Sequence, residues 1–128
     1  MVVDSSSIVA ILLVELEASA FTLKLSTSYN SSMSAASYVE TSLVMARDLG
    51  DEGFRRVDKL LRDLSIEIVS VTQQDAQLAR AAFLRYGKGR HKAGLNFGDC
   101  FSYALAKRLG EPLLFKGDDF SETDIQQA

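Results

Sequence analysis

The sequence has little of what a disulfide-stapled, fibrous or membrane-spanning protein needs. It contains one cysteine and one proline among 128 residues. Cys100 alone cannot form an internal disulfide, and the run of seven apolar residues from Ile8 to Val14 is far shorter than the ~20 residues of a membrane span. The N-terminus runs from Met1 into Asp4 without the basic region of a secretory signal. We therefore expect a soluble, cytoplasmic protein that does not bind membranes.

The chain also lacks a strong excess of either charge. Its 14 Lys and Arg residues and 17 Asp and Glu residues give a net charge of −3, which excludes a uniformly basic nucleic-acid binder but not a local basic patch. Hydrophobic residues make up 47% of the chain and charged residues 24%, as in ordinary globular proteins. No repeat or linker divides the sequence. We expect one domain over residues 1–128, long enough to bury its own core.

Strand and helix patterns alternate along the chain. Apolar runs predict strands at 1–3, 66–71 and 112–115, and residues 26–32 are predicted to form a polar loop. Apolar spacing and capping residues, with the serines at 5–7 as the first caps, predict helices at 5–12, 16–25, 35–49, 51–64, 72–87 and 96–110. Such alternation is typical of an α/β domain with a parallel sheet, in which functional residues gather at the carboxyl ends of the strands.

Two of the predicted helices carry apolar residues at a spacing that indicates a buried face. In the helix at 35–49 these residues are Val39, Leu43 and Ala46. In the helix capped by Asn96 they are Phe97, Phe101, Leu105 and Leu109. We expect both faces to lie in the core, with Cys100 packed beside the second rather than acting as a nucleophile.

Acidic residues occur where the carboxyl ends of the predicted strands should meet. Asp4 ends the first strand, and Asp118 and Asp119 follow the last one after a short turn. Asp99 lies in the first turn of the helix capped by Asn96, where the positive helix end favours a carboxylate. Each acid alone also has an ordinary explanation, as a helix-dipole residue or a turn residue. Together they predict a concentration of negative charge at one edge of the sheet.

Glu40 adds a carboxylate that local structure explains less well. It borders the apolar face of its helix, next to Val39 and one turn before Leu43. An ionised carboxylate buried there costs several kcal/mol unless it is paired or bound to a metal. The sequence leaves two explanations open, an ion pair with Arg47 and a shared metal site.

These acids can converge only around a cation. Two charges ~4 Å apart repel by about 4 kcal/mol at an effective dielectric constant of 20. Hard oxygen ligands select Mg²⁺ or Mn²⁺, and no Cys and His spacing competes for zinc. Such a site activates water and holds a phosphodiester for hydrolysis. Our candidate catalytic and metal-site residues are Asp4, Glu40, Asp99 and one of Asp118 and Asp119.

A basic segment precedes Asp99. Residues 76–98 contain five Lys and Arg residues and no acid. Tyr86, in the same segment, could stack on a base. A solvated charged face is the ordinary alternative, but the position next to Asp99 favours phosphate binding. The candidate RNA-backbone ligands, in a loop punctuated by glycines, are Lys88, Arg90 and Lys92.

Four stretches carry a family resemblance: Met1–Ser6, Ser34–Glu40, Leu95–Cys100 and Pro112–Phe120. In this order they resemble the PIN-domain ribonucleases, specifically the VapC-type toxins of bacterial toxin–antitoxin pairs. The resemblance implies a three-layer α/β/α fold with a mainly parallel sheet of four to five strands. It also implies a Mg²⁺-dependent endoribonuclease, a homodimer and a cognate antitoxin whose tail blocks the site. The implied metal-binding acids are Asp4, Glu40 and Asp99, with Ser6 assisting.

The chain departs from the family pattern after the last strand. Many PIN domains have Thr-x-Asp there, and an ungapped match puts Gly117 at that Asp. The fourth acid must then be Asp118 or Asp119, which would orient a second metal or the attacking water. Two other functions stay open: a non-catalytic RNA- or partner-binding module that keeps only the fold, and a phospho-receiver domain. The latter needs an Asp after a mid-chain strand, and the only mid-chain candidates lie in helical pattern: Asp48, Asp51 and Asp58.

Overall fold

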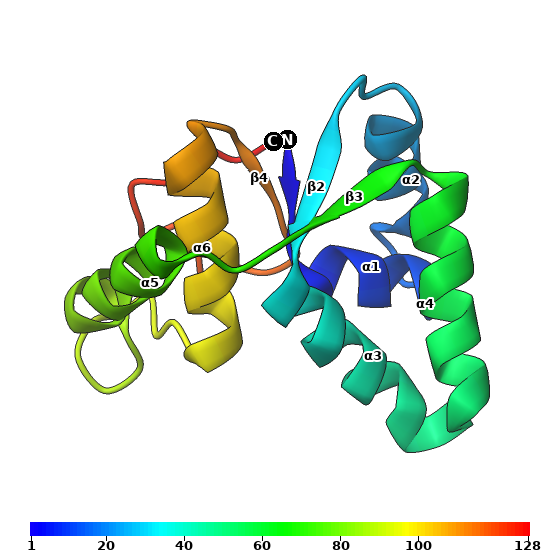
Figure 1. The fold of residues 1–128 in the computed structure, drawn as a ribbon, viewed down its shortest axis with the longest axis horizontal. Helices are drawn as coiled ribbons and strands as arrows, with labels where there is room; N and C mark the ends of the chain where they lie inside the picture. Colours follow the sequence, from blue (N-terminus) through cyan, green and yellow to red (C-terminus); the bar gives the residue numbers. More distant parts are fainter.

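A computed structural model describes residues 1–128 (Figure 1). Four strands form one sheet, β1 (Val2–Val3), β2 (Ser31–Ser34), β3 (Ile66–Val69) and β4 (Leu113–Leu114). The strand order is β3-β2-β1-β4, and every pair is parallel. Six helices connect the strands: α1 (Ser5–Leu12), α2 (Ala18–Ser26), α3 (Ala35–Leu49), α4 (Asp51–Asp63), α5 (Gln73–Tyr86) and α6 (Phe97–Leu109). The predicted α/β class with a parallel sheet is confirmed.

Helices cover both faces of the sheet, and alternate strand residues serve two cores. In Figure 1, α5 and α6 lie to the left of the sheet and α1 to α4 to the right. Val2 and Leu113 belong to the core beneath α5 and α6, whereas their neighbours Val3 and Leu114 belong to the core beneath α1 to α4. Successive side chains of a strand point to opposite faces. Even two-residue strands therefore suffice to anchor the three layers that the family resemblance implies.

Capping signals set several helix ends where the sequence predicts them. Thr72 and Asn96 each begin a helix with a capping box, and Gly110 ends α6 in the left-handed conformation. The prediction for the first helix is wrong in its cap. Asp4 caps α1 by accepting a hydrogen bond from a backbone N–H, while the serines at 5–7 already belong to the helix. The first strand thus passes directly into a helix at an acidic residue.

The polar loop predicted at 26–32 is partly a strand. β2 has the sequence Ser-Ser-Met-Ser, and all four residues are buried. It pairs with β1 on one side and β3 on the other. Pairing with two neighbouring strands, rather than local hydrophobicity, therefore places β2 in the sheet. One apolar residue, Met33, is too weak a signal for a strand in the sequence.

The buried faces predicted for α3 and α6 are wrong in part. On α3 the buried residues include Ser37, Thr41 and Ser42, whereas Val39 and Leu43 are 52% and 58% exposed. On α6 the buried face is centred on Cys100, Tyr103, Ala104 and Leu105, while Phe97 is 79% exposed. Small and hydroxyl-bearing residues let these two helices approach each other closely, and several hydroxyls bond to buried neighbours. Of the apolar residues expected inside, Leu105 is buried as predicted, whereas Val39, Leu43 and Phe97 form part of the surface.

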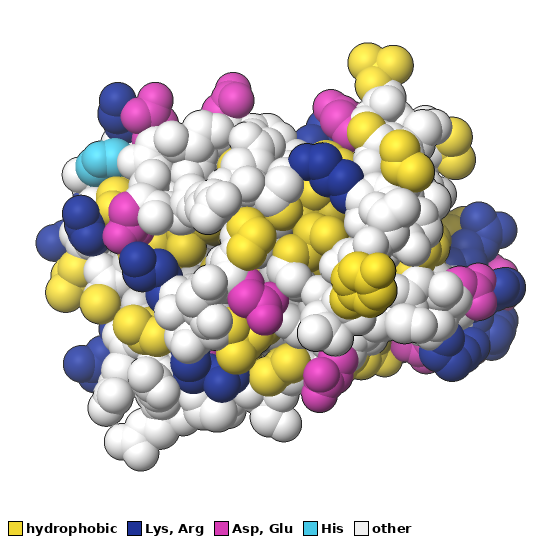
Figure 2. Space-filling model, turned by 90° about the horizontal axis from the view of Figure 1, so that it is seen from above, with side chains coloured by type: hydrophobic (Ala, Val, Ile, Leu, Met, Phe, Trp, Pro, Cys, Tyr) yellow, Lys and Arg dark blue, Asp and Glu magenta, His cyan; other side chains and the backbone are white.

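The remaining surface carries charges of both signs. Figure 2 shows acidic and basic side chains interspersed on the face seen from above, including the side where Figure 1 places α4. Along α4, Glu52 pairs with Arg55 and Arg56, and Lys59 pairs with Asp63. None of the helices has the length and apolar character that a membrane crossing demands.

Candidate functional site

The predicted acids gather around the carboxyl ends of the strands. Asp4 lies between β1 and α1, and Glu40 is on α3, which follows β2 directly. Asp99 occupies the first turn of α6, and Asp119 lies in the segment after β4. β1 is central, between β2 and β4. Because the strands are parallel, their carboxyl ends bring these segments to one edge of the sheet.

Asp4 accepts three hydrogen bonds, which hold both of its carboxylate oxygens. Its Oδ2 accepts hydrogen bonds from the Ser6 backbone N–H at 3.0 Å and from the Ser6 hydroxyl at 2.6 Å. Its Oδ1 accepts a hydrogen bond from the Ser102 hydroxyl at 2.6 Å. The Ser6 hydroxyl also accepts a bond from the Lys116 backbone N–H at 3.0 Å, which ties α1 to the turn after β4. Ser6 therefore contacts both an acid and the segment that carries the fourth acid.

Glu40 is not paired with Arg47. The Ser5 hydroxyl donates a hydrogen bond to Glu40 Oε1 at 2.5 Å, and no ion pair involves Arg47. The carboxylate lies against Gly98 so closely that a Cβ at this position would overlap it. Glycine at 98 thus makes room for Glu40 next to the first turn of α6. The alternative explanation of Glu40 as half of an ion pair with Arg47 is wrong.

Asp99 is a buried acid surrounded by like charge. In its capping box, Asp99 Oδ2 accepts a bond from the Asn96 N–H at 2.9 Å. Burial raises the pKa of Asp99, and repulsion from Asp4, Asp119 and Glu40 adds to it, so that the pKa reaches about 7 despite the Asn96 hydrogen bond. Asp119, rather than its neighbour Asp118, is one of the main sources of this repulsion. It is therefore the better candidate for the fourth acid.

The donor set is suited to a hard divalent cation. None of the site acids Asp4, Glu40, Asp99, Asp118 and Asp119 forms an ion pair, and the ligands they offer are all oxygens. Oxygen ligands fit Mg²⁺ or Mn²⁺. No group of three His, Cys, Asp or Glu side chains converges closely enough to share an ion. A bound ion therefore requires some of these carboxylates to reorient.

The predicted RNA-binding residues have different surroundings. Lys92 forms an ion pair with Glu122 at 2.6 Å, and Arg90 donates a hydrogen bond to the Leu84 carbonyl at 3.4 Å. Lys88 is exposed and forms no ion pair. Stacking of Tyr86 on a base is wrong as a prediction, because the ring is 5% exposed and packs against its neighbours. Lys88 is thus the one of these three cations whose side chain forms neither an ion pair nor a hydrogen bond.

Apart from Ser6, sequence reasoning did not single out the hydroxyl groups that hold the acids. Ser5 bonds to Glu40, Ser102 bonds to Asp4, and Ser37 bonds to Ser102. A weak signal exists in the spacing, since Ser37 precedes Glu40 by three residues and Ser102 follows Asp99 by three. Residues three apart on a helix share a face. The site therefore has a second layer of serines beneath its carboxylates.

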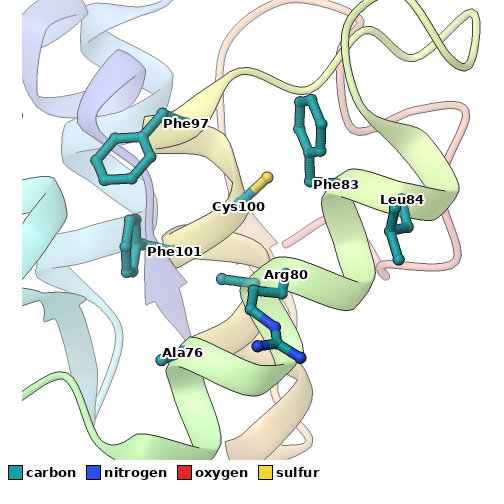
Figure 3. A pocket seen from close by; sticks show the side chains of 8 residues that line it. Ala76, Arg80, Phe83, Leu84, Phe97, Cys100 and Phe101 are labelled. Atoms are coloured by element: carbon teal, nitrogen blue, oxygen red, sulfur yellow. The ribbon is translucent and has the colours of Figure 1, made fainter.

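An apolar cleft adjoins the acids. Figure 3 shows Phe97 and Phe101 of α6 on one side of this cleft and Phe83 and Leu84 of α5 on the other, with Cys100 at its floor. The cleft encloses about 690 Å³. A second groove on the α3 side of the two phenylalanines is lined by Val39, Leu43, Gly98 and Glu40, among others. The exposed apolar surface thus reaches the acidic edge.

Buried Cys100 offers no nucleophile in this cleft. Burial raises the pKa of its thiol to about 11, and the charge of Asp99 adds to the effect. The thiolate that a nucleophile requires is therefore suppressed. The phospho-receiver alternative also fails, since β3 is followed by Ser70 and Val71 rather than by an aspartate.

Comparisons with known proteins agree with this architecture. A PIN domain model matches residues 1–126. Ribonuclease VapC30 of Mycobacterium tuberculosis is 50% identical over 125 residues, covering 98% of this chain and 95% of the relative, and Ribonuclease VapC42 of the same organism is 48% identical over 129 residues, covering 100% and 98%. Ribonuclease VapC of Mycolicibacterium smegmatis is 49% identical over 125 residues, covering 98% and 97%.

Solved structures show the same fold at low sequence identity. The crystal structure of Mycobacterium tuberculosis VapC20, a sarcin-ricin loop cleaving toxin, matches with a TM-score of 0.78 at 18% identity, covering 99% of this chain and 97% of that one. A toxin–antitoxin complex from Klebsiella pneumoniae matches with a TM-score of 0.71 at 16% identity, covering 96% and 92%. The matched family model and the near full-length identity to curated relatives lead to one conclusion: this chain belongs to the PIN-domain family and is one of its VapC ribonucleases.

Proposed function

We propose that this protein is a Mg²⁺- or Mn²⁺-dependent endoribonuclease that acts as the toxin of a toxin–antitoxin pair. The observation that carries the proposal is the set of acids without ion pairs at the carboxyl edge of the sheet, where burial and, after it, repulsion from the other acids raise the pKa of Asp99. Folded proteins normally pair or neutralise buried charge. An uncompensated acidic cluster at this edge is best explained by a cation and its phosphate substrate.

Each acid has a role in the proposal. Asp4, Glu40 and Asp99 hold the ion, and Asp119 orients the attacking water or a second ion. When bound, the ion supplies Lewis-acid activation of water and of the phosphodiester. Ser6 supports the site by fixing Asp4 Oδ2 and the backbone of Lys116.

Exposed cations beside the first turn of α6 serve to bind the RNA backbone. Lys88 is free for this contact. The Lys92 ammonium must leave Glu122, and Arg90 retains guanidinium N–H groups beyond the one bonded to Leu84. Exposed ion pairs are worth at most about 1 kcal/mol, so a phosphate can compete for Lys92. The expected partners of the site are therefore RNA and, as a competitor, the tail of an antitoxin.

The proposed function includes a homodimer formed through the apolar cleft. Phe97 protrudes from the surface directly beside a hollow lined by Phe83, Leu84 and Phe101. A protruding side chain next to a hollow on the same surface suits a two-fold symmetric contact, in which each copy inserts its Phe97 into the hollow of the other copy. Replacing Phe97 with Asp is expected to yield monomers, as measured by sedimentation equilibrium. A monomer in the unsubstituted protein would contradict this contact.

The nuclease proposal is tested by incubating the purified chain with total RNA in Mg²⁺ or in EDTA, beside an Asp99→Asn variant. We expect discrete fragments that require both the metal and Asp99. The same variant must show an unchanged circular dichroism spectrum. Absence of cleavage by folded, antitoxin-free protein would instead favour a non-catalytic RNA- or partner-binding module that keeps only the fold.

A further inference from the structure

A chain of two buried hydroxyls ends on the carboxylate of Asp4. The Ser37 and Ser102 hydroxyls are 3.0 Å apart, and the Ser102 hydroxyl lies 2.6 Å from Asp4 Oδ1. The two serines are 1% and 0% exposed, and Asp4 is 2% exposed. These three groups are almost fully shielded from solvent, so the hydrogen bonds among them are made within the protein.

The direction of the hydrogen bonds is fixed by what each group can donate. An ionised carboxylate only accepts, so Ser102 donates its single hydroxyl hydrogen to Asp4 Oδ1. The bond between the two serines must then be donated by Ser37. Both hydroxyl dipoles point toward Asp4, and hydrogen bonds to charged acceptors are the stronger kind. Ser37 thereby strengthens the contact that Ser102 makes.

The two hydrogen-bonded serines also join the three segments that carry the main acids. Ser37 is three residues before Glu40 on α3, and Ser102 is three residues after Asp99 on α6. Their contact ties α3 to α6 one helical turn beneath the two acids, and the bond to Asp4 adds the end of β1. A buried serine usually bonds to the backbone, as Ser7 does to the Leu114 carbonyl at 2.9 Å. The chain from Ser37 is different because it ends on a site acid.

We propose that Ser102, supported by Ser37, is a positioning residue that fixes Asp4 for metal binding. Ser6 already holds Oδ2 through its N–H and hydroxyl, and Ser102 holds Oδ1. With both oxygens held, the plane of the carboxylate is set. Outer partners of this kind orient metal ligands, and their loss typically costs 10–100-fold in metal affinity or activity. This inference rests on the proposed function, since it takes Asp4 as a metal ligand.

The test is Mn²⁺ affinity, measured by electron paramagnetic resonance on the purified full chain without RNA. Ser102→Ala is expected to weaken binding roughly tenfold. Ser37→Ala is expected to weaken it less, because Ser102 keeps its hydrogen bond to Asp4. The matched control is Ser42→Ala, which removes a buried α3 hydroxyl that donates its hydrogen bond to the Tyr38 carbonyl rather than to a site acid. Its Mn²⁺ affinity should equal that of the unsubstituted protein.

The outcomes separate the positioning role from the metal site itself. Affinity reduced in the Ser102 variant but not in the Ser42 variant, with both chains folded by circular dichroism, supports the inference. Equal affinity in all four proteins overturns the inference and leaves the metal site intact. If the unsubstituted chain binds no Mn²⁺, the metal site is refuted and the inference with it. Should Ser102→Ala fail to fold, a Ser37→Ala affinity equal to that of the Ser42 control also overturns the proposal.

Discussion

Asp75 and Asp99 have the same local structure and opposite surroundings. Each is the third residue of its helix and closes a capping box, with its carboxylate 3.0 Å and 2.9 Å, respectively, from the backbone N–H of Thr72 and Asn96. The Asp75 carboxylate is also bonded to the Arg108 guanidinium, at 2.6 Å. Asp99 has no such cation and is repelled by other acids. The shared capping motif is therefore compatible with two different roles.

The pKa of each carboxyl reports that difference. Burial alone would raise both values. At Asp75, hydrogen bonds from Arg108 and Thr72 outweigh burial and hold the pKa below its ordinary value. At Asp99, repulsion adds to burial and raises the pKa to about 7. A capping box explains why an acid stands at a helix start, and the presence or absence of a cation shows whether its charge serves structure or function.

Removing the charge of Asp99 is expected to reduce activity, whereas removing the charge of Asp75 is expected to reduce stability. Asp99→Asn keeps the cap but removes a proposed metal ligand, so RNA cleavage should fall at least about 100-fold without loss of thermal stability. Asp75→Asn leaves Arg108 unpaired and should cost about 1–3 kcal/mol of unfolding free energy while cleavage is retained. Cleavage assays measure the activity of both variants, and urea unfolding measures their stability. Full activity in the Asp99 variant would refute its role.

Adding a methyl group next to Glu40 tests the acid edge without changing any charge. A Cβ at position 98 would overlap the Glu40 carboxylate, so Gly98→Ala should displace it and reduce cleavage roughly 10–100-fold. Stability should change little, because alanine favours a helix over glycine. In a Glu40→Ala background the same substitution should have no further effect. A full additional loss there would show that Gly98 acts through something other than Glu40.

The two consecutive aspartates after β4 are expected to differ. Asp119 is one of the main sources of repulsion at Asp99, and Asp118 is not. Asp119→Asn should therefore lower cleavage about tenfold, and Asp118→Asn, its matched neighbour, should leave it within twofold. Initial rates on one RNA substrate compare the two. A larger loss at Asp118 would reverse the assignment of the fourth acid.

The two capping aspartates should also give opposite pH dependences of stability in EDTA. The pKa of Asp99 is raised in the folded state, so the folded chain binds an extra proton, and unfolding free energy should increase by roughly 2–3 kcal/mol as the pH falls from 8 to 5. Because the pKa of Asp75 is lowered in the folded state, its ionised carboxylate stabilises the fold at pH values above the unfolded-state pKa near 4. This contribution is lost as the pH falls further. Urea unfolding from pH 3.5 to 8 measures both trends.

Asp99→Asn provides the control for the pH experiment. In this variant the gain in stability between pH 8 and pH 5 should disappear, while the loss near pH 4 remains. An unchanged gain would assign the effect to another group.

The sequence predicts the acids better than the groups around them. Asp4 follows an apolar run and Asp99 follows a capping residue, so strand ends and helix starts locate both. Nothing local distinguishes Asp99 from Asp75, because the cation of Asp75 comes from Arg108, 33 residues away. The contact of Ser102 with Asp4 likewise spans 98 residues and appears only in the fold.

The failures of pattern reasoning have a common cause. Val39 and Phe97 have the spacing of core residues, but hydroxyl and small residues occupy the α3–α6 contact and leave the apolar ones outside. β2 has only Met33 as an apolar residue and becomes a strand through its two partners. Periodicity finds apolar faces, and it does not say whether the protein or a partner covers them.

The most direct test of the acidic cation site is thermal unfolding with and without Mg²⁺ at pH 8. Saturating ligand stabilises the folded state by about 2.7 kcal/mol at one hundred times its dissociation constant. We expect Mg²⁺ to raise the melting temperature of the unsubstituted chain and of Asp75→Asn by the same amount, and to leave Asp99→Asn unchanged. An equal rise in all three proteins, or no rise in any, would contradict a cation site built around Asp99.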